Sequence, residues 1–382
     1  MDITGVNVNI KSWCKNLEKG ALEQAVVLTT LPFLHERVCL MADCHQGYGM
    51  PIGGVIATKG VVIPNAVGVD IGCGVITNGT SIKVSSMHQS QLKKIISRIK
   101  DEIPVGFKKR GVVHKWGVIP VVDGQTVVKE HYDNAQVSLG TLGGGNHFIE
   151  LQENQYGYLQ IMIHTGSRNL GKQICEYYND LAIKLNKQFF NYTKDLAFLP
   201  LDSDIGRSYM AEMHYALEFA KENRKLILQI VESILHDEIG VHVNWTPLDI
   251  HHNYASMENH FGKNVLVHRK GAIKVNEGDL GIVPGSQGSK SYIVEGLGNR
   301  ESFNSCSHGA GRKMGRKQAQ RELDLQTEIK KMDDMGIIHN ITSIKDLDET
   351  VSAYKDIEVV MSEQKDLIRI VRTLTPIATI KG

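Results

Sequence analysis

The chain has 382 residues, which is enough to bury a large core, and its 43 basic and 42 acidic residues nearly cancel. This balance excludes a general polybasic coat for nucleic acid but leaves room for a local basic groove. No apolar run approaches the roughly 20 residues that span a bilayer, and the N-terminal residues lack the features of a secretory signal. We therefore expect a cytoplasmic protein with no membrane partner.

Short apolar runs interrupted by glycine and proline predict strands and turns over residues 1–80. A helix is predicted over residues 85–103, because leucine and isoleucine recur on one face and Pro104 lies beyond its end. Residues 159–163 form an apolar run that predicts a buried strand leading into a turn. Residues 170–190 predict a second helix.

The strongest helical pattern covers residues 208–238, where apolar side chains recur at helical spacing with charges between them. Residues 264–298 return to short strands and turns. Two more helices are predicted, a polar one over residues 311–336 and a last one over residues 361–374. Candidate site residues are spread over most of the chain. We therefore expect one α+β domain over residues 1–382, with mixed β-sheets carrying the ligand loops and α-helices flanking them.

Five separate segments carry a side chain suited to metal or phosphate on a glycine-rich turn. The first contains Asp70 and Cys73, and a carboxylate with a thiol on a tight turn suits a transition metal. Alone, this pair would be read as a turn cap and a buried cysteine. The second segment places Asn146 and His147 after Gly143–Gly145, whose backbone N–H groups can point at one anion.

The other three segments each contribute histidine. His164 ends an apolar strand, and Thr165, Ser167 and Arg168 follow it as oxyanion partners. His251 and His252 are adjacent, so on a strand they point to opposite faces, and the residues alone leave open which of them reaches a shared site.

The fifth segment is SCSHGAGR, in which His308 stands on a glycine-rich turn before an arginine. A histidine in this setting can bind phosphate or attack it as a nucleophile. Lys270 in HRKGA and Ser286 in PGSQG also suit phosphate or nucleotide binding.

Together the five segments supply enough ligands for two divalent metal ions. Thiolate, imidazole and carboxylate in one set favour Mn, Zn, Fe or Co over Mg or Ca alone. The six cysteines include no CxxC pair, so in a reducing compartment they are free thiols or ligands. Metal ligands beside phosphate-binding glycines predict phosphoryl or nucleotidyl transfer.

Eight motifs resemble, in this order, the RtcB family of RNA ligases: MADCHQGYGMPIGGV, VGVDIGCG, GTLGGGNHFIE, HTGSR, HHNY, HRKGA, PGSQG and SCSHGAGR. The final Lys381-Gly382 is also similar to that family. The resemblance implies an enzyme that joins an RNA 3′-phosphate or 2′,3′-cyclic phosphate end to a 5′-hydroxyl end, using GTP and Mn²⁺. It implies covalent histidine–GMP and RNA-(3′)pp(5′)G intermediates, a role in tRNA splicing or RNA repair, and an activating accessory protein as a candidate partner.

The resemblance also implies a role for each motif residue. His308 would be the guanylylated nucleophile, Asp43 would assist guanylyl transfer, and Lys270 would lie beside the phosphates. It favours His252 over its neighbour as a ligand. Two Mn²⁺ ions, bridged by Cys73, would be bound by Asp70, Cys73, His147, His164 and His252. The GTP pocket would be lined by Asn146, Phe148, Glu150, Asn253, Ser286, Ser291, Gly309, Ala310, Gly311, Tyr354 and Lys381.

The RNA is expected in a basic groove near the site, with Arg168 and Arg312 as its binding residues. The remaining groove residues are expected to be Lys108, Lys109, Arg110, Lys313 and Arg316. Two alternatives use the same residues differently. One is a metal-dependent phosphoesterase that acts on RNA cyclic phosphate ends without a covalent nucleotide. The other is a non-catalytic protein that binds RNA ends.

Overall fold

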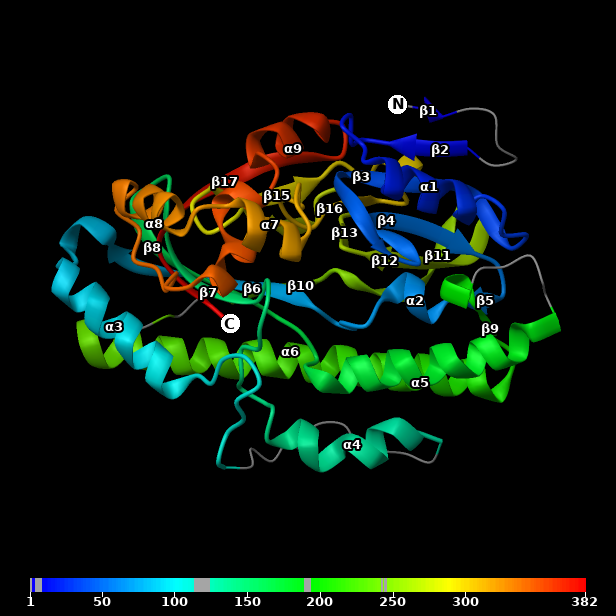
Figure 1. Ribbon diagram of the computed structural model, residues 1–382, viewed down its shortest axis with the longest axis horizontal. Coiled ribbons are helices and arrows are strands. Elements are labelled where there is room, and N and C mark those ends of the chain that lie inside the picture. Colours follow the sequence, from blue (N-terminus) through cyan, green and yellow to red (C-terminus); the bar gives the residue numbers. More distant parts are fainter. Residues whose placement is uncertain (1, 4–8, 113–123, 189–193, 242, 244–245) are drawn as a thin grey trace.

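The computed structural model describes residues 2–3, 9–112, 124–188, 194–241, 243 and 246–382, and two large β-sheets dominate it (Figure 1). The first sheet has the order β1-β2-β3-β4-β12-β11 and is mixed, because β2 runs parallel to β3 while the other neighbours are antiparallel. Its strands are β1 (Asp2–Ile3), β2 (Asn9–Ser12), β3 (Leu34–Tyr48), β4 (Met50–Thr58), β11 (Asn253–His260) and β12 (Lys263–Lys270).

The second sheet has the order β10-β6-β8-β7-β17-β15-β14, with antiparallel neighbours. In its register His164 lies between Val75 on one side and Phe148 on the other, and His251 lies opposite Gly74. Strand ends that carry candidate site residues are therefore neighbours. The strands are β6 (Gly74–Lys83), β7 (Phe148–Asn154), β8 (Tyr158–Thr165), β10 (Leu248–His251), β14 (Leu280–Val283), β15 (Ser291–Gly296) and β17 (Ile368–Lys381).

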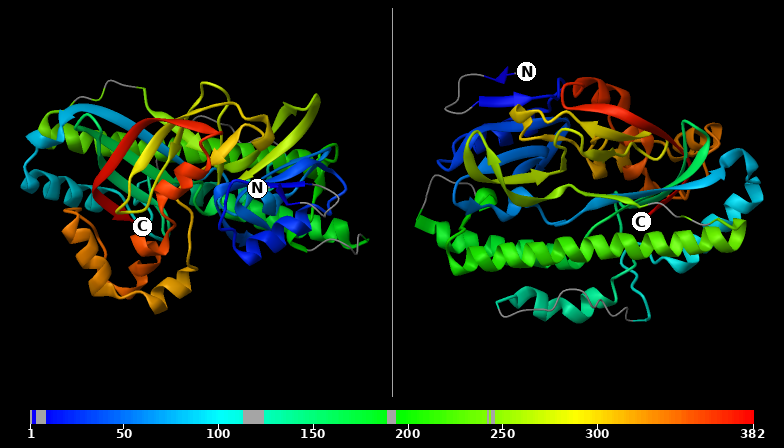
Figure 2. Two further views of the ribbon diagram at one scale, coloured as in Figure 1. Left: turned by 90° about the horizontal axis from the view of Figure 1, so that it is seen from above. Right: turned by 180° about the vertical axis from the view of Figure 1, so that it is seen from behind.

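Long helices form a layer beneath the sheets, as Figure 1 and the rear view in Figure 2 show. The longest is α6 (Asp204–Ile239), which the Ser203 hydroxyl caps by accepting a hydrogen bond from the Gly206 N–H at 3.0 Å. The helix ends at Gly240, whose φ of 68° is the left-handed conformation that glycine adopts without strain. One stripe of α6 is buried at helical spacing and packs under the second sheet.

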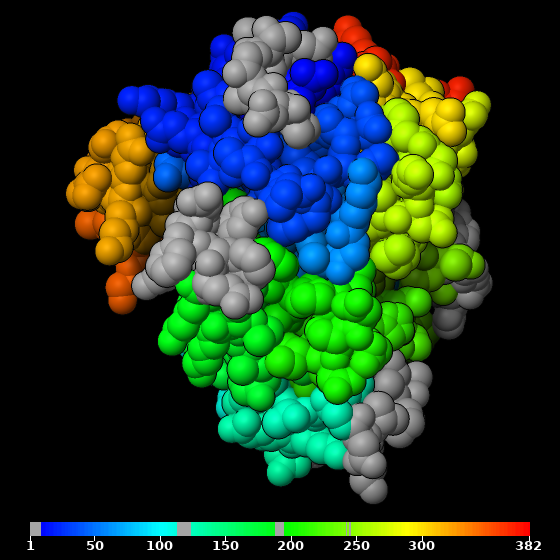
Figure 3. All heavy atoms as spheres, turned by 90° about the vertical axis from the view of Figure 1, so that its right-hand side faces the viewer, coloured from blue at the N-terminus to red at the C-terminus, as the bar shows by residue number. Residues whose placement is uncertain are grey.

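Three further helices complete this layer and its outer side: α3 (Gln89–Glu102), α4 (Thr126–Gln136) and α5 (Asn169–Leu185). Helix α5 packs against α6, and α4 packs against α5. The end-on view in Figure 3 shows the N-terminal strands (blue) above the long helices (green), with α4 (teal) outermost.

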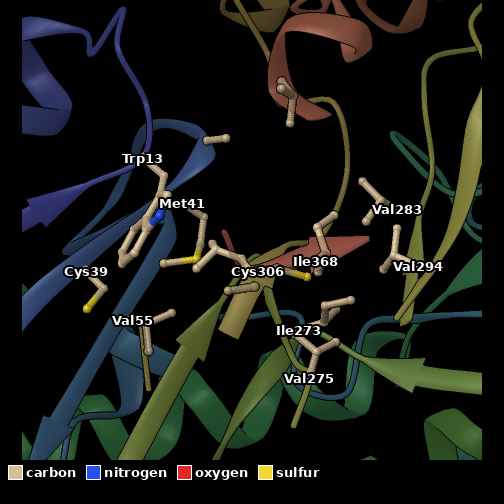
Figure 4. Packing of buried hydrophobic residues seen from close by; sticks show 14 of the residues in the cluster. Trp13, Cys39, Met41, Val55, Ile273, Val275, Val283, Val294, Cys306 and Ile368 are labelled. Carbon is tan, nitrogen blue, oxygen red and sulfur yellow. The ribbon is translucent and has the colours of Figure 1, made fainter. Parts of the chain in front are cut away.

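A hydrophobic cluster joins the two sheets and supports the segment that leads to His308 (Figure 4). Trp13 and Met41 come from the first-sheet side, and Val294 and Ile368 come from β15 and β17 of the second sheet. Between them lies the small pair β13 (Ala272–Lys274) and β16 (Ser305–Ser307). Burial of this pair fixes the chain directly before His308.

The structure confirms the helix expected over residues 208–238 as the core of α6, and residues 85–103 contain α3. The helix expected over residues 170–190 corresponds to α5, although its last two residues lie outside the described residues. The predicted strand before His164 is β8.

Three sequence-based expectations of secondary structure were wrong. Residues 361–374 contain the end of α9 (Ile357–Glu363) and then β17, because that segment pairs with β15 and β7 on both sides. The polar helix over residues 311–336 is instead two, α7 (Arg316–Glu322) and α8 (Leu325–Asp334), since Asp324 caps a new helix by accepting from Thr327 N–H.

The third error concerns the N-terminal part, where only strands and turns were expected. Helices α1 (Lys19–Leu28) and α2 (Pro64–Val67) interrupt the strands there. Helix α1 buries Ala21, Ala25 and Leu28 against the outer face of the first sheet, and this tertiary burial supplies stability that the short segment lacks alone. Among the residues that the structure describes, no helix is both long and apolar enough to cross a membrane.

Candidate active site

Four chain segments bring the candidate metal ligands to one place. Asp70 and Cys73 lie in the turn before β6, His147 directly precedes β7, His164 lies near the end of β8, and His252 lies between β10 and β11. Because β10, β6, β8 and β7 are consecutive in the second sheet, these segments are neighbours in space.

The ligand atoms face a common point. The Cys73 Sγ lies 3.2 Å from Nε2 of His164 and 3.4 Å from Nε2 of His147. The His164 Nε2 is 3.3 Å from Nε2 of His252, and Oδ2 of Asp70 is 3.1 Å from Nε2 of His147. Two groups of three result, Cys73 with His164 and His252, and Asp70 with Cys73 and His147, each with ligand atoms within 4.8 Å of one another. Cys73 belongs to both groups.

The histidines of the first group are neutral and correctly oriented for ligation. Nδ1 of His164 donates to the Asn146 carbonyl at 3.0 Å, which leaves the Nε2 lone pair directed at Cys73. Burial, together with neighbouring histidines, holds the pKa values of His164 and His252 well below the usual histidine value. Both rings therefore offer lone pairs at neutral pH.

The pKa values of the thiol and the carboxylate shift in opposite directions, although burial raises both. Burial and then the Asp70 charge raise the pKa of Cys73 well above its usual value. Burial also raises the pKa of Asp70, but the hydrogen bond and charge of His147 outweigh it and lower that pKa to about 2. A metal ion at Cys73 would have to displace the thiol proton. Thiol, imidazole and carboxylate donors at one point fit a transition metal.

His308 follows β16 and is held by Asp43 of β3. Oδ2 of Asp43 accepts hydrogen bonds from Nδ1 of His308 at 2.7 Å and from the His308 backbone N–H at 3.1 Å. The Asp43 side chain is completely buried, and its backbone carbonyl lies 3.0 Å from Nδ1 of His45. Since Nδ1 of His308 is engaged, Nε2 is its free nitrogen. The His308 and His252 ring centroids are 4.7 Å apart, so this nitrogen belongs to the same site as the metal ligands.

Two glycines make this approach possible. Gly311 has a φ of 72°, and a Cβ there would lie 2.2 Å from the Asp43 carbonyl oxygen. Gly271 has a φ of 64°, and a Cβ there would lie 3.0 Å from Cε1 of His308. A side chain at Gly311 would displace Asp43, and one at Gly271 would collide with Ile52 and crowd the His308 ring.

A cavity of about 420 Å³ opens over the cluster. Of the predicted site residues it is lined by Asp70, Cys73, Asn146, His147, Phe148, His164, His252, Asn253, Lys270, His308, Gly309, Ala310, Gly311, Arg312, Tyr354 and Lys381. Lys270 is buried at the wall of this cavity, where Nζ donates to the Asn65 carbonyl at 3.1 Å and also to the Tyr48 carbonyl. Burial lowers the pKa of Lys270 to about 8.

One end of the cavity is formed by β7 and β17. Lys381 pairs with Phe148 in the sheet, and its Nζ lies 4.8 Å from the Phe148 ring centroid. Glu150 lies two residues further along β7 and is buried. Burial raises the pKa of Glu150 to about 7, although the charge of Lys381 opposes this shift. This end therefore combines an aromatic face and a partly buried amine, with a buried carboxyl group behind them.

Three predicted nucleotide contacts lie behind the cavity wall. Glu150 and Ser291 both accept hydrogen bonds from Nε2 of Gln152, at 2.8 and 3.1 Å, and Ser291 also accepts from Gly285 N–H. Ser286 is paired with the Ser289 hydroxyl at 2.9 Å. Asp43 is likewise behind the wall and reaches the cavity through His308.

The two predicted RNA-binding arginines are partly buried and have partners within the protein. Arg168 donates to the Gly106 carbonyl at 3.2 Å and lies 3.3 Å from Nδ1 of His147. Arg312 donates to Glu349 at 3.1 Å and to the Tyr354 hydroxyl at 3.3 Å. Lys313 and Arg316 face solvent and line a groove beside the cavity. Lys108 and Lys109 also face solvent, in another segment.

Several residues of the site were missed by the sequence analysis. His45 lines the cavity, and its position two residues after Asp43 in the motif MADCHQGYGMPIGGV could have indicated this. Asn223 and Arg224 lie beneath the metal ligands on α6. They were hidden because a polar residue inside an amphipathic helix has no distinguishing pattern.

Comparison with known proteins identifies the family. A family model described as tRNA-splicing ligase RtcB matches residues 24–119 and 110–382. The chain belongs to the RtcB family. The RNA-splicing ligase RtcB of Escherichia coli (strain K12) is 35% identical over 412 residues, which cover 100% of this chain and 99% of that protein.

Other RtcB proteins match at similar length. The RNA-splicing ligase RtcB of Mycobacterium tuberculosis (strain ATCC 25618 / H37Rv) is 30% identical over 440 residues, covering 94% of this chain and 100% of that protein. The tRNA-splicing ligase RtcB of Nanoarchaeum equitans (strain Kin4-M) is 30% identical over 450 residues, covering 96% and 93%. The family membership predicted from the motifs is confirmed.

Proposed function

We propose that this chain is an RNA ligase that joins an RNA 3′-phosphate or 2′,3′-cyclic phosphate end to a 5′-hydroxyl end with GTP. Membership of the RtcB family supports the ligase activity. The observation that carries the chemistry is the position of His308, which is bound to buried Asp43 and lies 4.7 Å, ring to ring, from His252. A nucleophile with a free nitrogen thus faces a metal-ligand cluster.

The cluster would hold two Mn²⁺ ions. Asp70, Cys73 and His147 would bind one ion and Cys73, His164 and His252 the other, with the Cys73 thiolate bridging them. When bound, divalent ions neutralise charge that develops on the transferring phosphoryl group. Neutral His164 and His252 suit this role because neither must lose a proton to bind.

In the first step His308 attacks GTP. Its Nε2 forms a bond to the α-phosphorus while the bond to the β-phosphate bridging oxygen breaks, and pyrophosphate leaves. Asp43 holds the proton on Nδ1, so the positive charge that develops on the imidazole faces a carboxylate at 2.7 Å. Lys270, at the wall of the same cavity, would contact the phosphates.

The nucleotide would lie in the cavity between His308 and the β7–β17 end. Phe148 and Tyr354 offer aromatic faces there and partly buried Lys381 offers an amine, while the carboxyl group of buried Glu150 lies behind the wall at this end. The other proposed contacts come from Asn146, Asn253, Ser286, Ser291, Gly309, Ala310 and Gly311.

In the later steps the RNA 3′-phosphate oxygen attacks the phosphorus bound to His308, which forms RNA-(3′)pp(5′)G and frees the histidine. The RNA 5′-hydroxyl then attacks the 3′-phosphate, the new phosphodiester forms, and GMP leaves. A cyclic phosphate end must first be hydrolysed in the same site.

The RNA would reach the cavity along a neighbouring groove of about 640 Å³, which is lined by His45, Arg312, Lys313 and Arg316 together with acidic Glu18. His45, Arg312 and Arg316 line both this groove and the main cavity, so the two are continuous. Arg168, Lys108, Lys109 and Arg110 would extend the basic surface near Gly143, whose carbonyl accepts from the Gly106 N–H at 2.8 Å. A single catalytic domain, a cytoplasmic location and an activating accessory protein remain part of the proposal.

The test is a ligation assay with two short RNAs, one ending in a 3′-phosphate and the other beginning with a 5′-hydroxyl. Joining is expected with GTP and Mn²⁺ together, and it should be lost when either is omitted or when His308 is replaced by alanine. Hydrolysis of a cyclic phosphate without GTP, unaffected by His308→Ala and with no joining, would instead establish the phosphoesterase. Binding of RNA ends that needs no metal and leads to no turnover would instead favour a non-catalytic protein that binds RNA ends.

A further inference from the structure

The guanidinium of Arg224 lies directly beneath the candidate metal ligands. Arg224 is in the middle of α6 and is completely buried. Its Nη1 donates to two backbone carbonyls, that of Gly72 at 2.9 Å and that of Thr165 at 3.0 Å. Nε and Nη2 donate to the two carboxylate oxygens of Asp249 at 2.6 and 3.3 Å, and Nη2 also donates to Nδ1 of His251 at 3.0 Å.

Each of these acceptors is next to, or near, a candidate ligand in the sequence. Gly72 directly precedes Cys73, and Thr165 directly follows His164. His251 directly precedes His252, with Asp249 two residues earlier. One side chain thus connects three ligand-bearing segments that are far apart in the chain: the turn before β6, the end of β8 and the end of β10.

Arginine suits this position better than any other residue. Its guanidinium has five N–H donors fixed in one plane, so it can serve acceptors in several directions without rearranging. A lysine ammonium keeps the charge but cannot reach the same carbonyls simultaneously. The guanidinium also packs closely against Gly74, since a Cβ at that position would lie 3.1 Å from Cζ and Nη1 of Arg224.

The neighbouring residue on α6 supports the remaining segments in the same way. Oδ1 of Asn223 accepts from Gly140 N–H at 2.7 Å, and Nδ2 donates to the carbonyls of Thr141 at 3.1 Å and Gly166 at 3.3 Å. Gly140 and Thr141 begin the segment that leads to Asn146 and His147. Helix α6 therefore supports every segment that carries a candidate ligand.

We propose that Arg224 is a positioning residue that fixes the relative places of Cys73, His164 and His252 and thereby sets the affinity of the site for its metal ions. The inference rests on the proposed function, because it takes these three residues as ligands. Groups behind metal ligands typically change metal affinity by about 10- to 100-fold when replaced. The competing explanation is an internal ion pair with Asp249 that stabilises the fold and nothing more.

The experiment compares Arg224→Lys with Arg269→Lys, the matched control. Arg269 is equally buried and donates to Glu258 at 2.5 Å, to Ser305 at 2.9 Å and to the Phe303 carbonyl at 2.8 Å, and none of these partners lies in a segment that carries a candidate metal ligand. Mn²⁺ affinity is measured by calorimetry without GTP or RNA, at a pH where both proteins are folded. Co²⁺ is then added instead, and its thiolate charge-transfer absorption reports whether Cys73 is a ligand.

The expected result is an affinity for Mn²⁺ that falls about 10- to 100-fold in Arg224→Lys, with an altered Co²⁺ spectrum, and wild-type behaviour in Arg269→Lys. Equal affinity and spectrum in Arg224→Lys and the wild type would overturn the inference while leaving the metal site intact. If the wild type itself binds neither ion, the metal site of the proposed function fails, and the inference fails with it.

If Arg224→Lys does not fold, Asp249→Asn replaces it. That variant keeps the shape of the side chain and removes the charge that orients the guanidinium. A smaller decrease in Mn²⁺ affinity, several-fold rather than 100-fold, is expected. An unchanged affinity in folded Asp249→Asn would overturn the inference.

Discussion

Replacing Asp43 with asparagine should slow covalent GMP transfer to His308 while the protein stays folded and binds metal. Oδ2 of Asp43 accepts from Nδ1 and from the backbone N–H of His308, at 2.7 and 3.1 Å. Asparagine has the same size and retains one oxygen acceptor, so it can preserve the arrangement. It lacks the negative charge that stabilises the imidazole as its Nε2 bonds to phosphorus.

The size of the effect follows from the environment of this contact. Asp43 is completely buried, and a hydrogen bond to a charged group contributes about 1.5 to 3 kcal/mol. Because each 1.36 kcal/mol in the barrier is about tenfold in rate, we expect guanylyl transfer to slow about 10- to 150-fold.

The assay is a single-turnover measurement of GMP attachment under saturating GTP and Mn²⁺, quenched at intervals and resolved on a denaturing gel. Asp279→Asn is the control, since Asp279 is exposed and contacts Asn276 far from the site. A rate for Asp43→Asn within twofold of the wild type, with His308 confirmed as the attachment point, would refute the role given to Asp43.

Three further predictions address the metal, the buried carboxyl group and the buried lysine. Cys73→Ser should remove the donor that is common to both ligand groups, so calorimetry should no longer show two bound Mn²⁺ ions. Unchanged stoichiometry and affinity would contradict the proposal that the Cys73 thiolate bridges the two ions. Because burial raises the pKa of Glu150 to about 7, the folded state binds this proton more tightly than the unfolded state, and the unfolding free energy should decrease as pH rises from about 4.5 to about 7. In Glu150→Gln the decrease in unfolding free energy between pH 5 and pH 8, measured by denaturant unfolding, should be smaller than in the wild type by up to about 3 kcal/mol. Parallel pH profiles of the two proteins would contradict the raised pKa of Glu150. Because burial lowers the pKa of Lys270 to about 8, its charge is present below that pH and lost above it, so GTP affinity measured by equilibrium binding should weaken as pH rises through 8. Lys270→Arg should bind GTP independently of pH in this range, and a wild type with equal affinity at pH 7 and pH 9 would exclude the phosphate contact.

The sequence contained most of the candidate ligand cluster because Asp70, Cys73, His147 and His164 lie on or beside glycine-containing turns. The His251–His252 pair could not be resolved from alternation alone, and the structure shows the two rings on opposite sides. His252 faces His164 at 3.3 Å, whereas His251 contacts Arg224 and the Gly72 carbonyl. The resemblance favours His252, which is the member of the pair that lies among the other candidate ligands, and its role as a ligand stays a prediction.

The fold was predictable where local pattern and tertiary environment agree, as in α6. It was not predictable for β17, where Ile368 and Ile380 belong to a strand whose neighbours β7 and β15 are distant in the chain. Arg224 is a similar case. The role proposed for it depends on the Gly72 and Thr165 carbonyls and the Asp249 carboxylate, which only the folded chain brings together. The single-domain organisation stays a prediction.

Covalent labelling of metal-reconstituted protein with α-phosphate-labelled GTP and Mn²⁺, followed by a denaturing gel with His308→Ala alongside, tests the role of His308 as the nucleophile. We expect a labelled wild-type band that acid releases and that hydroxide leaves in place, because the bond would be a phosphoramidate, and no band in His308→Ala. Calorimetry must show Mn²⁺ bound to both proteins. A wild type that binds Mn²⁺ but takes no label, or a variant that is labelled as strongly as the wild type, would contradict this role of His308.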